Sequence, residues 1–322
     1  MSAEDDSSGW QLTESDPGVF SELLKTLGVP MIVDDLYSLD PDTLASLQPL
    51  HALIFLFKWI PSSADSSTST GQYDPDFPGF FAHQVVNNAC ATLAVLNALG
   101  NISSLQTGPQ LAELNSFTTG MDPQTRGMVI TSADWLREAH NALSPPNAVS
   151  LDGLGLPRKS EDAYHFVVYL PIMGAVYELD GLKQYPVRHG PYEDHGEGWL
   201  KTAREVIENR IATYPVGALE FSLLALRDDP LPSLLTRLQE VQASGNSAAT
   251  AEILSQISNE KSKQQRWAFE NSLRKHNHVG LIHALLIALA KGGKLSSAQE
   301  QAKTIMRARV EKKASGEDMD ED

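Results

Sequence analysis

The chain has 322 residues, of which 42% are hydrophobic and 20% charged, a composition typical of globular domains. Its formal net charge of −16 argues against nucleic-acid binding, because an acidic surface repels phosphates. One cysteine excludes internal disulfides and cysteine-based zinc sites, and no apolar run approaches the ~18 residues that span a bilayer.

The N-terminal sequence is acidic and lacks the basic start and apolar segment of a secretory signal. We therefore expect a cytoplasmic protein, with nuclear entry left open. Residues 1–8 are polar and are expected to be disordered.

From residue 9 to 227, helical and strand patterns are mixed. Phe20, Leu23, Leu24 and Leu27 have helical spacing, and Gly28 follows as a stop. The patterns further predict a strand at 52–60, helices at 88–99 and 132–143, a β-hairpin of 165–171 with 175–180, and a strand at 221–226. Helices followed by a run of strands indicate an α+β domain.

The segment Gln84-Val-Val-Asn-Asn-Ala-Cys90-Ala-Thr contains the only cysteine. If Asn87 or Asn88 caps the helix, Cys90 lies in its first turn, where the helix dipole stabilises a thiolate. A lone cysteine is more often a small buried hydrophobe, but such a residue gains nothing from this position. Gln84, on the approaching loop, can donate its amide to an oxyanion that forms beside Cys90.

A thiolate nucleophile needs a base, and nine histidines compete for that role. His165 opens one strand of the predicted hairpin, and Asp180 closes the other. With a turn at 172–174, residues whose numbers add to roughly 345 face each other, which pairs His165 with Asp180. A carboxylate beside the imidazole orients the ring and stabilises the imidazolium.

Three blocks, residues 84–92, 163–169 and 177–183, resemble the signature blocks of ubiquitin C-terminal hydrolases, in the order that this family shows. The resemblance extends from about residue 10 to 226. It implies a papain-like α+β fold with a central antiparallel sheet flanked by helices. It also implies that Cys90 is the nucleophile, His165 the general base and acid, Asp180 the orienting carboxylate and Gln84 the oxyanion donor. The substrates implied are ubiquitin conjugates.

No cofactor or metal is expected. His189 and His195 share a polar loop, but no further ligands follow at a useful spacing. Residues 144–163 form a long stretch without periodicity. In the family the corresponding segment crosses over the active site, so we expect a lid here rather than an ordinary linker.

Three apolar helical stripes follow, at 231–241, 253–273 and 281–289, and predict a helical hairpin and a third helix. Residues 267–282 are similar to the C-terminal domain of the long, proteasome-associated subfamily. That similarity implies a docking domain at 228–295 for a ubiquitin-receptor subunit of the proteasome. Residues 296–322 are expected to form a charged, partly disordered tail.

Three alternatives stay open. The chain can be an idle or autoinhibited ubiquitin-binding subunit that acts by docking, although an idle protein has no need of an intact triad. It can be a general cysteine peptidase, which would hydrolyse short unrelated peptides. It can also act on a ubiquitin-like modifier instead of ubiquitin.

Overall fold

The computed structural model describes residues 8–58, 71–103, 105–144, 164–214, 221–276 and 278–315. The predicted lid lies almost wholly outside these ranges. The helices are α1 Pro17–Thr26, α2 Pro41–Ser46, α3 Cys90–Leu99, α4 Pro109–Phe117, α5 Pro123–Ser132, α6 Asp134–Asn141, α7 Trp199–Ala212, α8 Pro230–Ala243, α9 Ser247–Arg274, α10 Val279–Lys291 and α11 Leu295–Ser315. The strands are β1 Met31–Asp35, β2 Leu50–Lys58, β3 Gln72–Tyr73, β4 Tyr164–Ile172, β5 Ala175–Leu179, β6 Val187–Pro191 and β7 Phe221–Asp228.

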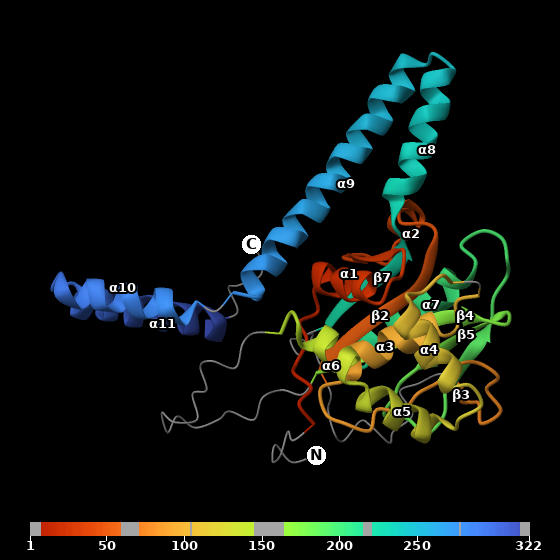
Figure 1. The fold of residues 1–322 in the computed structure, drawn as a ribbon, viewed down its shortest axis with the longest axis horizontal. Helices are drawn as coiled ribbons and strands as arrows, with labels where there is room; N and C mark the ends of the chain where they lie inside the picture. The colour runs from red at the N-terminus through yellow and green to blue at the C-terminus, as the bar shows by residue number, and fades with distance from the viewer. Residues whose placement is uncertain are drawn as a thin grey trace. The chain divides into compact units, whose positions relative to one another are not determined.

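The seven strands form one sheet in the order β1-β7-β2-β4-β5-β6-β3, and every neighbouring pair is antiparallel (Figure 1). This confirms the predicted α+β fold with a central antiparallel sheet. The predicted strand at 52–60 corresponds to β2, which begins two residues earlier, and the strand predicted at 221–226 corresponds to β7.

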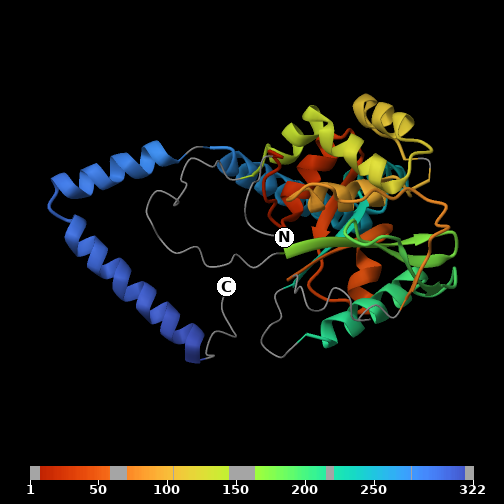
Figure 2. The same cartoon turned by 90° about the horizontal axis from the view of Figure 1, so that it is seen from below.

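Both faces of the sheet are buried, because alternate residues of a strand point to opposite sides. On β2, Ala52 and Ile54 join a core with α1, α3, α5 and α6, whereas Leu53, Phe55 and Phe57 join a second core with α2 and α7. Figure 2 shows α7 on one side of the sheet and the yellow α4 and α5 on the other. The central strands β2, β4 and β7 therefore carry apolar residues on both faces.

α3 lies in the first core, and all its residues from Ala91 to Leu99 are buried. The predicted N-cap is wrong. The cap residue is Ala89, which offers no side-chain hydrogen bond, and Asn88 instead adopts φ +64° and donates its amide to the Trp10 carbonyl at 3.0 Å. The prediction that Cys90 lies in the first helical turn is confirmed, since Cys90 is the first residue of α3.

Two further predictions need correction. The helix predicted at 132–143 is α6, and it is separate from α5 because Ala133 is extended, with ψ 105°. The β4–β5 hairpin exists, but its partners add to 347, as in Val168↔Leu179, and the ladder ends there. His165 therefore pairs with Phe57 of β2 and is not opposite Asp180 in the hairpin.

α8 and α9 form the predicted helical hairpin, which turns at Gly245 with φ +70° (Figure 1). The far half of α9 packs against α1: Trp267 is buried on Gly18, and Asn271 donates to the Gly18 carbonyl at 2.9 Å. These two helices thus belong to the same compact unit as the sheet, so the predicted boundary at 227 separates elements that pack together.

The third predicted helix is α10, which with α11 belongs to a second compact unit. Residues 296–322 are expected to form a charged, partly disordered tail, and the structure describes a helix, α11, in this region as far as Ser315. Alanine, glutamine and lysine, all good helix formers, recur in that stretch. No single described helix has the length and composition to cross a membrane. α10 and α11 together meet that test from Gly280 to Ile305, but the chain bends by 117° between them.

Candidate active site

Cys90 is half-buried at the point where α3 begins, so its thiol is held by a rigid helix and is still reachable from solvent. The backbone N–H groups of a first helical turn have no partner inside the helix, and they carry the positive end of the helix dipole. Negative charge that develops beside this turn during a reaction is therefore stabilised.

His165 and Asp180 meet inside the protein. The two residues are 4% and 6% exposed, and His165 Nε2 lies 2.6 Å from Asp180 Oδ1. The Cys90 side chain is hydrogen-bonded to His165 as well, and Nδ1 is the ring nitrogen left for that contact. The structure thus brings the three residues predicted from the sequence into one thiol–imidazole–carboxylate chain.

The charges around His165 favour its protonated form. Burial on its own lowers the pKa of His165, but the Asp180 carboxylate and the hydrogen bond with Cys90 outweigh burial and raise that pKa to about 9. Burial raises the pKa of Asp180, but the imidazolium of His165 more than compensates and lowers it below the ordinary value. The site therefore favours a protonated His165 ring against the Asp180 carboxylate.

Asp180 lies just beyond the last residue of β5, in a tight turn. Its Oδ1 also accepts the Leu182 N–H at 2.9 Å, and its carbonyl accepts the Lys183 N–H at 2.9 Å. The carboxylate is thus fixed by its own turn rather than by the β4–β5 ladder. The two functional side chains meet although their backbones are not paired in the sheet.

Gln84 lies on the loop before α3, and its backbone N–H donates to the carbonyl of Gly181 at 2.8 Å. Its side-chain Nε2 donates to the Val86 carbonyl at 3.1 Å, which uses one of the two N–H bonds of the amide. The second N–H of the amide is not used by this hydrogen bond. Among the described residues, the buried Oε1 has no hydrogen-bond partner.

A buried ion cluster behind the hairpin was not predicted from the sequence. Glu178 of β5 is 1% exposed, and its carboxylate contacts Lys183 at 2.7 Å, Arg210 at 3.0 Å and His189 at 3.1 Å. Burial raises the pKa of Glu178, but the neighbouring cations outweigh it and hold that pKa well below its ordinary value. Since Glu178 and Lys183 flank Asp180, their ion pair closes the turn that carries the orienting carboxylate.

His83, His189 and His195 make other polar contacts. His189 binds Glu178 whereas His195 pairs with exposed Glu193, so the two histidines of the polar loop have different partners. The described residues contain no cluster of three or more His, Cys, Asp or Glu side chains suited to a metal ion. His83 lies 3.0 Å from the carbonyl of Gln184.

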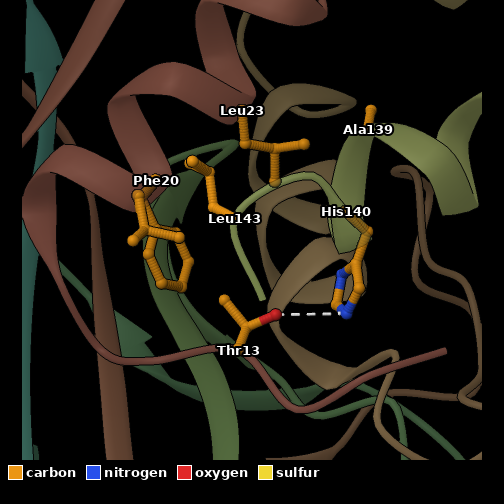
Figure 3. Close-up of a pocket in the computed structure, with 7 residues that line it drawn as sticks. Thr13, Phe20, Leu23, Ala139, His140 and Leu143 are labelled. Atoms are coloured by element: carbon orange, nitrogen blue, oxygen red, sulfur yellow. Dashed lines mark hydrogen bonds between the residues drawn. The ribbon is translucent and has the colours of Figure 1, made fainter. Parts of the chain in front are cut away.

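His140 lines a small cavity of about 10 Å³, room for about one water molecule, together with Thr13, Val19, Phe20, Leu23, Ala139 and Leu143 (Figure 3). Its Nε2 lies 3.1 Å from Thr13 Oγ1 and 2.7 Å from the Gln11 carbonyl, and its Nδ1 lies 2.7 Å from Thr92 Oγ1. Burial lowers the pKa of His140 and keeps the ring neutral. His140 therefore ties the N-terminal segment to α3 and does not line the Cys90 site.

This geometry fits nucleophilic catalysis on a carbonyl. The thiolate can attack, an imidazolium is positioned to protonate a leaving group, and the carboxylate fixes the ring. Backbone and side-chain N–H groups near the start of α3 can receive the negative charge that develops on the carbonyl oxygen.

Two family profiles match the chain. "Ubiquitin carboxyl-terminal hydrolase, family 1" covers residues 10–212, and a second profile, "Ubiquitin carboxyl-terminal hydrolases", covers residues 250–295. Ubiquitin carboxyl-terminal hydrolase ubh-4 of Caenorhabditis elegans is 37% identical over 90% of each chain. Ubiquitin carboxyl-terminal hydrolase 2 of Schizosaccharomyces pombe is 37% identical over 88% of this chain and 91% of its own.

A crystal structure of Trichinella spiralis UCH37 bound to ubiquitin vinyl methyl ester superposes with a TM-score of 0.65 at 30% identity. The match covers 80% of this chain and 99% of that one.

Proposed function

Because the chain belongs to family 1 of the ubiquitin carboxyl-terminal hydrolases and is a cysteine-type deubiquitinase, we propose that it cleaves after the C-terminal glycine of ubiquitin with Cys90, His165 and Asp180 as its triad. The observation that carries this assignment is the Cys90–His165–Asp180 chain of contacts. The ubiquitin-derived ligand of the UCH37 structure supports ubiquitin as the substrate.

In the first step, Cys90 Sγ attacks the carbonyl carbon of the terminal glycine, and the C–S bond forms as the carbonyl π electrons move to oxygen. The oxyanion accepts hydrogen bonds from Gln84 Nε2 and the Cys90 N–H. When the tetrahedral species collapses, the C–N bond to the substrate lysine breaks, and the His165 imidazolium protonates the departing amine.

In the second step, neutral His165 takes a proton from a water molecule, which attacks the thioester carbonyl. The C–S bond breaks, and the thiolate and the imidazolium are restored. Asp180 holds the ring in place and stabilises its positive charge through both steps, without being protonated itself.

The test is release of a fluorophore from the C-terminus of ubiquitin by the parent chain, Cys90→Ala and His165→Gln. The proposal predicts turnover by the parent and none by Cys90→Ala, with both proteins folded. If the parent shows no turnover but binds ubiquitin, the alternative of an idle or autoinhibited ubiquitin-binding subunit is favoured. Cleavage of short unrelated peptides would favour a general cysteine peptidase. Faster cleavage of a ubiquitin-like modifier than of ubiquitin would show that this modifier is the substrate.

We further propose that residues 228–322 dock the enzyme on a ubiquitin-receptor subunit of the proteasome. The support is the second profile match and the apolar surface of α10, where Leu281, Ile282, Leu285 and Leu286 are 47–60% exposed. Large exposed apolar side chains mark interaction surfaces.

The test is binding of the full-length Leu281→Asp, Leu285→Asp double variant to purified proteasomes. The docking proposal predicts loss of binding, whereas a matched Lys291→Asp variant in the same helix keeps it. Unchanged binding by the double variant would contradict the docking role of α10.

A further inference from the structure

Two asparagines, Asn97 of α3 and Asn101 in the turn that follows this helix, hold the loop that carries Gln84. The Ala82 N–H donates to Asn97 Oδ1 at 2.8 Å, and Asn97 Nδ2 donates back to the Ala82 carbonyl at 3.2 Å. Asn101 does the same for Phe80, with distances of 2.8 Å and 2.7 Å. Each carboxamide therefore acts as a peptide group does in a β-ladder, with one donor and one acceptor.

The backbone groups of Phe81 and His83, which alternate with Phe80 and Ala82 in the loop, point to the opposite side. The Phe81 carbonyl accepts a hydrogen bond from Arg126 Nη1 at 2.6 Å, and the His83 N–H donates to the Pro123 carbonyl at 3.0 Å. This alternation is the pattern of an extended chain, in which every second residue turns its N–H and C=O to the same side. The loop is thus hydrogen-bonded on one edge to Asn97 of α3 and to Asn101, and on the other edge to α5.

The spacing of the two asparagines matches that of the loop. Residues four apart on a helix are separated by about 6 Å, and residues two apart on an extended chain by about 6.6 Å. Asn101 pairs with residue 80 and Asn97 with residue 82, whereas the N–H of residue 84 donates to the Gly181 carbonyl. The two pairs therefore run along the helix towards the first turn of α3, where Cys90 lies, as the loop runs towards Gln84.

We propose that Asn97 is a positioning residue for the oxyanion donor: it fixes the register of the Gln84 segment against the helix that carries Cys90. This inference rests on the proposed role of Gln84. Asn97 lies seven residues, two turns, after Cys90 on the same helix face, and it is 1% exposed. A slip of one residue would move Gln84 by about 3.3 Å, far more than an oxyanion donor tolerates.

Asn97→Ala tests the proposal in the full-length enzyme. Loss of the register should lower kcat for ubiquitin–fluorophore hydrolysis by about 10- to 100-fold, because a misplacement of about 1 Å has effects of this size. The rate at which iodoacetamide alkylates Cys90 should stay within about twofold, because that reaction needs a thiolate but no oxyanion donor.

Asn141→Ala is the matched control. Asn141 also pairs a carboxamide with backbone groups, accepting from the Gln11 N–H at 3.0 Å and donating to the Gly9 carbonyl at 2.7 Å. Both partners belong to the N-terminal segment and not to the Gln84 loop. Its removal should leave kcat unchanged. If Asn97→Ala fails to fold, Asn101→Ala is tested instead, because it removes the neighbouring pair of hydrogen bonds, to Phe80, at a half-buried site.

A double-mutant cycle with Gln84→Ala decides whether Asn97 acts through Gln84. The proposal predicts that Asn97→Ala causes no further loss of kcat in the Gln84→Ala background. It is overturned if kcat does not change, if alkylation slows in step with kcat, or if the two losses multiply. A fully active Gln84→Ala variant would instead overturn the role of Gln84, and the inference with it, while leaving the triad assignment standing.

Discussion

His165 Nε2 and Asp180 Oδ1 lie 2.6 Å apart, and the two side chains are only 5% and 8% exposed. In such a site an ionic hydrogen bond is little weakened by water, and replacing the carboxylate has a large effect. The same oxygen accepts the Leu182 N–H, so the orientation of the carboxylate is set before substrate arrives.

Asp180→Asn should lower kcat by about 10²- to 10⁴-fold, because the neutral amide no longer stabilises the imidazolium or fixes its ring. The pKa of His165 should fall below about 9, since the charge of Asp180 no longer offsets the effect of burial. Steady-state hydrolysis of a ubiquitin–fluorophore conjugate, measured against pH, gives both quantities. A variant that retains parental kcat and pH profile would show that Asp180 is not the orienting group.

The raised pKa of His165 also makes stability depend on pH. A group with a raised folded-state pKa contributes stability that is fully present below its ordinary value, 6.5, and is lost as the pH rises through about 9. The free energy of unfolding in urea should therefore decline between pH 6.5 and 9. His165→Gln cannot titrate and should show a shallower decline, whereas parallel curves for the two proteins would contradict the assigned pKa.

Gly181→Ala should disturb the oxyanion donor without touching the triad side chains. A Cβ at Gly181 would lie 3.1 Å from the Gln84 N and 3.3 Å from its Cβ, so the Gln84 segment must shift by a few tenths of an ångström. We expect kcat to fall by about tenfold, in line with the sensitivity of catalysis to placement. Gly280→Ala, where the added Cβ meets nothing within 4 Å, is the control. Unchanged turnover by Gly181→Ala would show that the loop adapts freely.

The four site residues were predictable because each combines a chemical type with a position in the chain. Cys90 begins a helix, and His165 and Asp180 belong to a hairpin visible in the apolar pattern. The contact between His165 and Asp180 was predicted from a hairpin register in which partner numbers add to 345, whereas the observed partners add to 347. His165 and Asp180 nevertheless meet, because the turn at Asp180, and not the strand pairing, orients the carboxylate.

Other features depend on tertiary contacts that no local pattern reveals. Asn97 reads as an ordinary polar residue in an apolar helix, and only the fold shows that its amide pairs with Ala82. Asn88 looked like a helix cap from its residue type, but its amide binds the Trp10 carbonyl, 78 residues away in the chain. Glu178 likewise accepts a hydrogen bond from Arg210, which lies 32 residues away in the chain.

Glu178→Ala should destabilise the fold by about 3–5 kcal/mol, because Arg210 and Lys183 would be left without their buried counter-charge. Urea unfolding measures this change. Glu193→Ala is the control, since it removes a glutamate from an ion pair with His195 in which both side chains are about 80% exposed; it should alter stability by less than about 0.5 kcal/mol. Equal effects of the two substitutions would show that the buried cluster contributes nothing beyond a surface pair.

The most direct test of the central claim, attack by Cys90 on the C-terminus of ubiquitin, is the intact mass of the chain after incubation with ubiquitin vinyl methyl ester. Cys90 is the only cysteine, so a thiol adduct can form nowhere else. The account predicts that the parent gains one ubiquitin, that peptide mapping places it on Cys90, and that Cys90→Ala gains none. A folded parent that gains no ubiquitin, or a Cys90→Ala variant that is still modified, would contradict it.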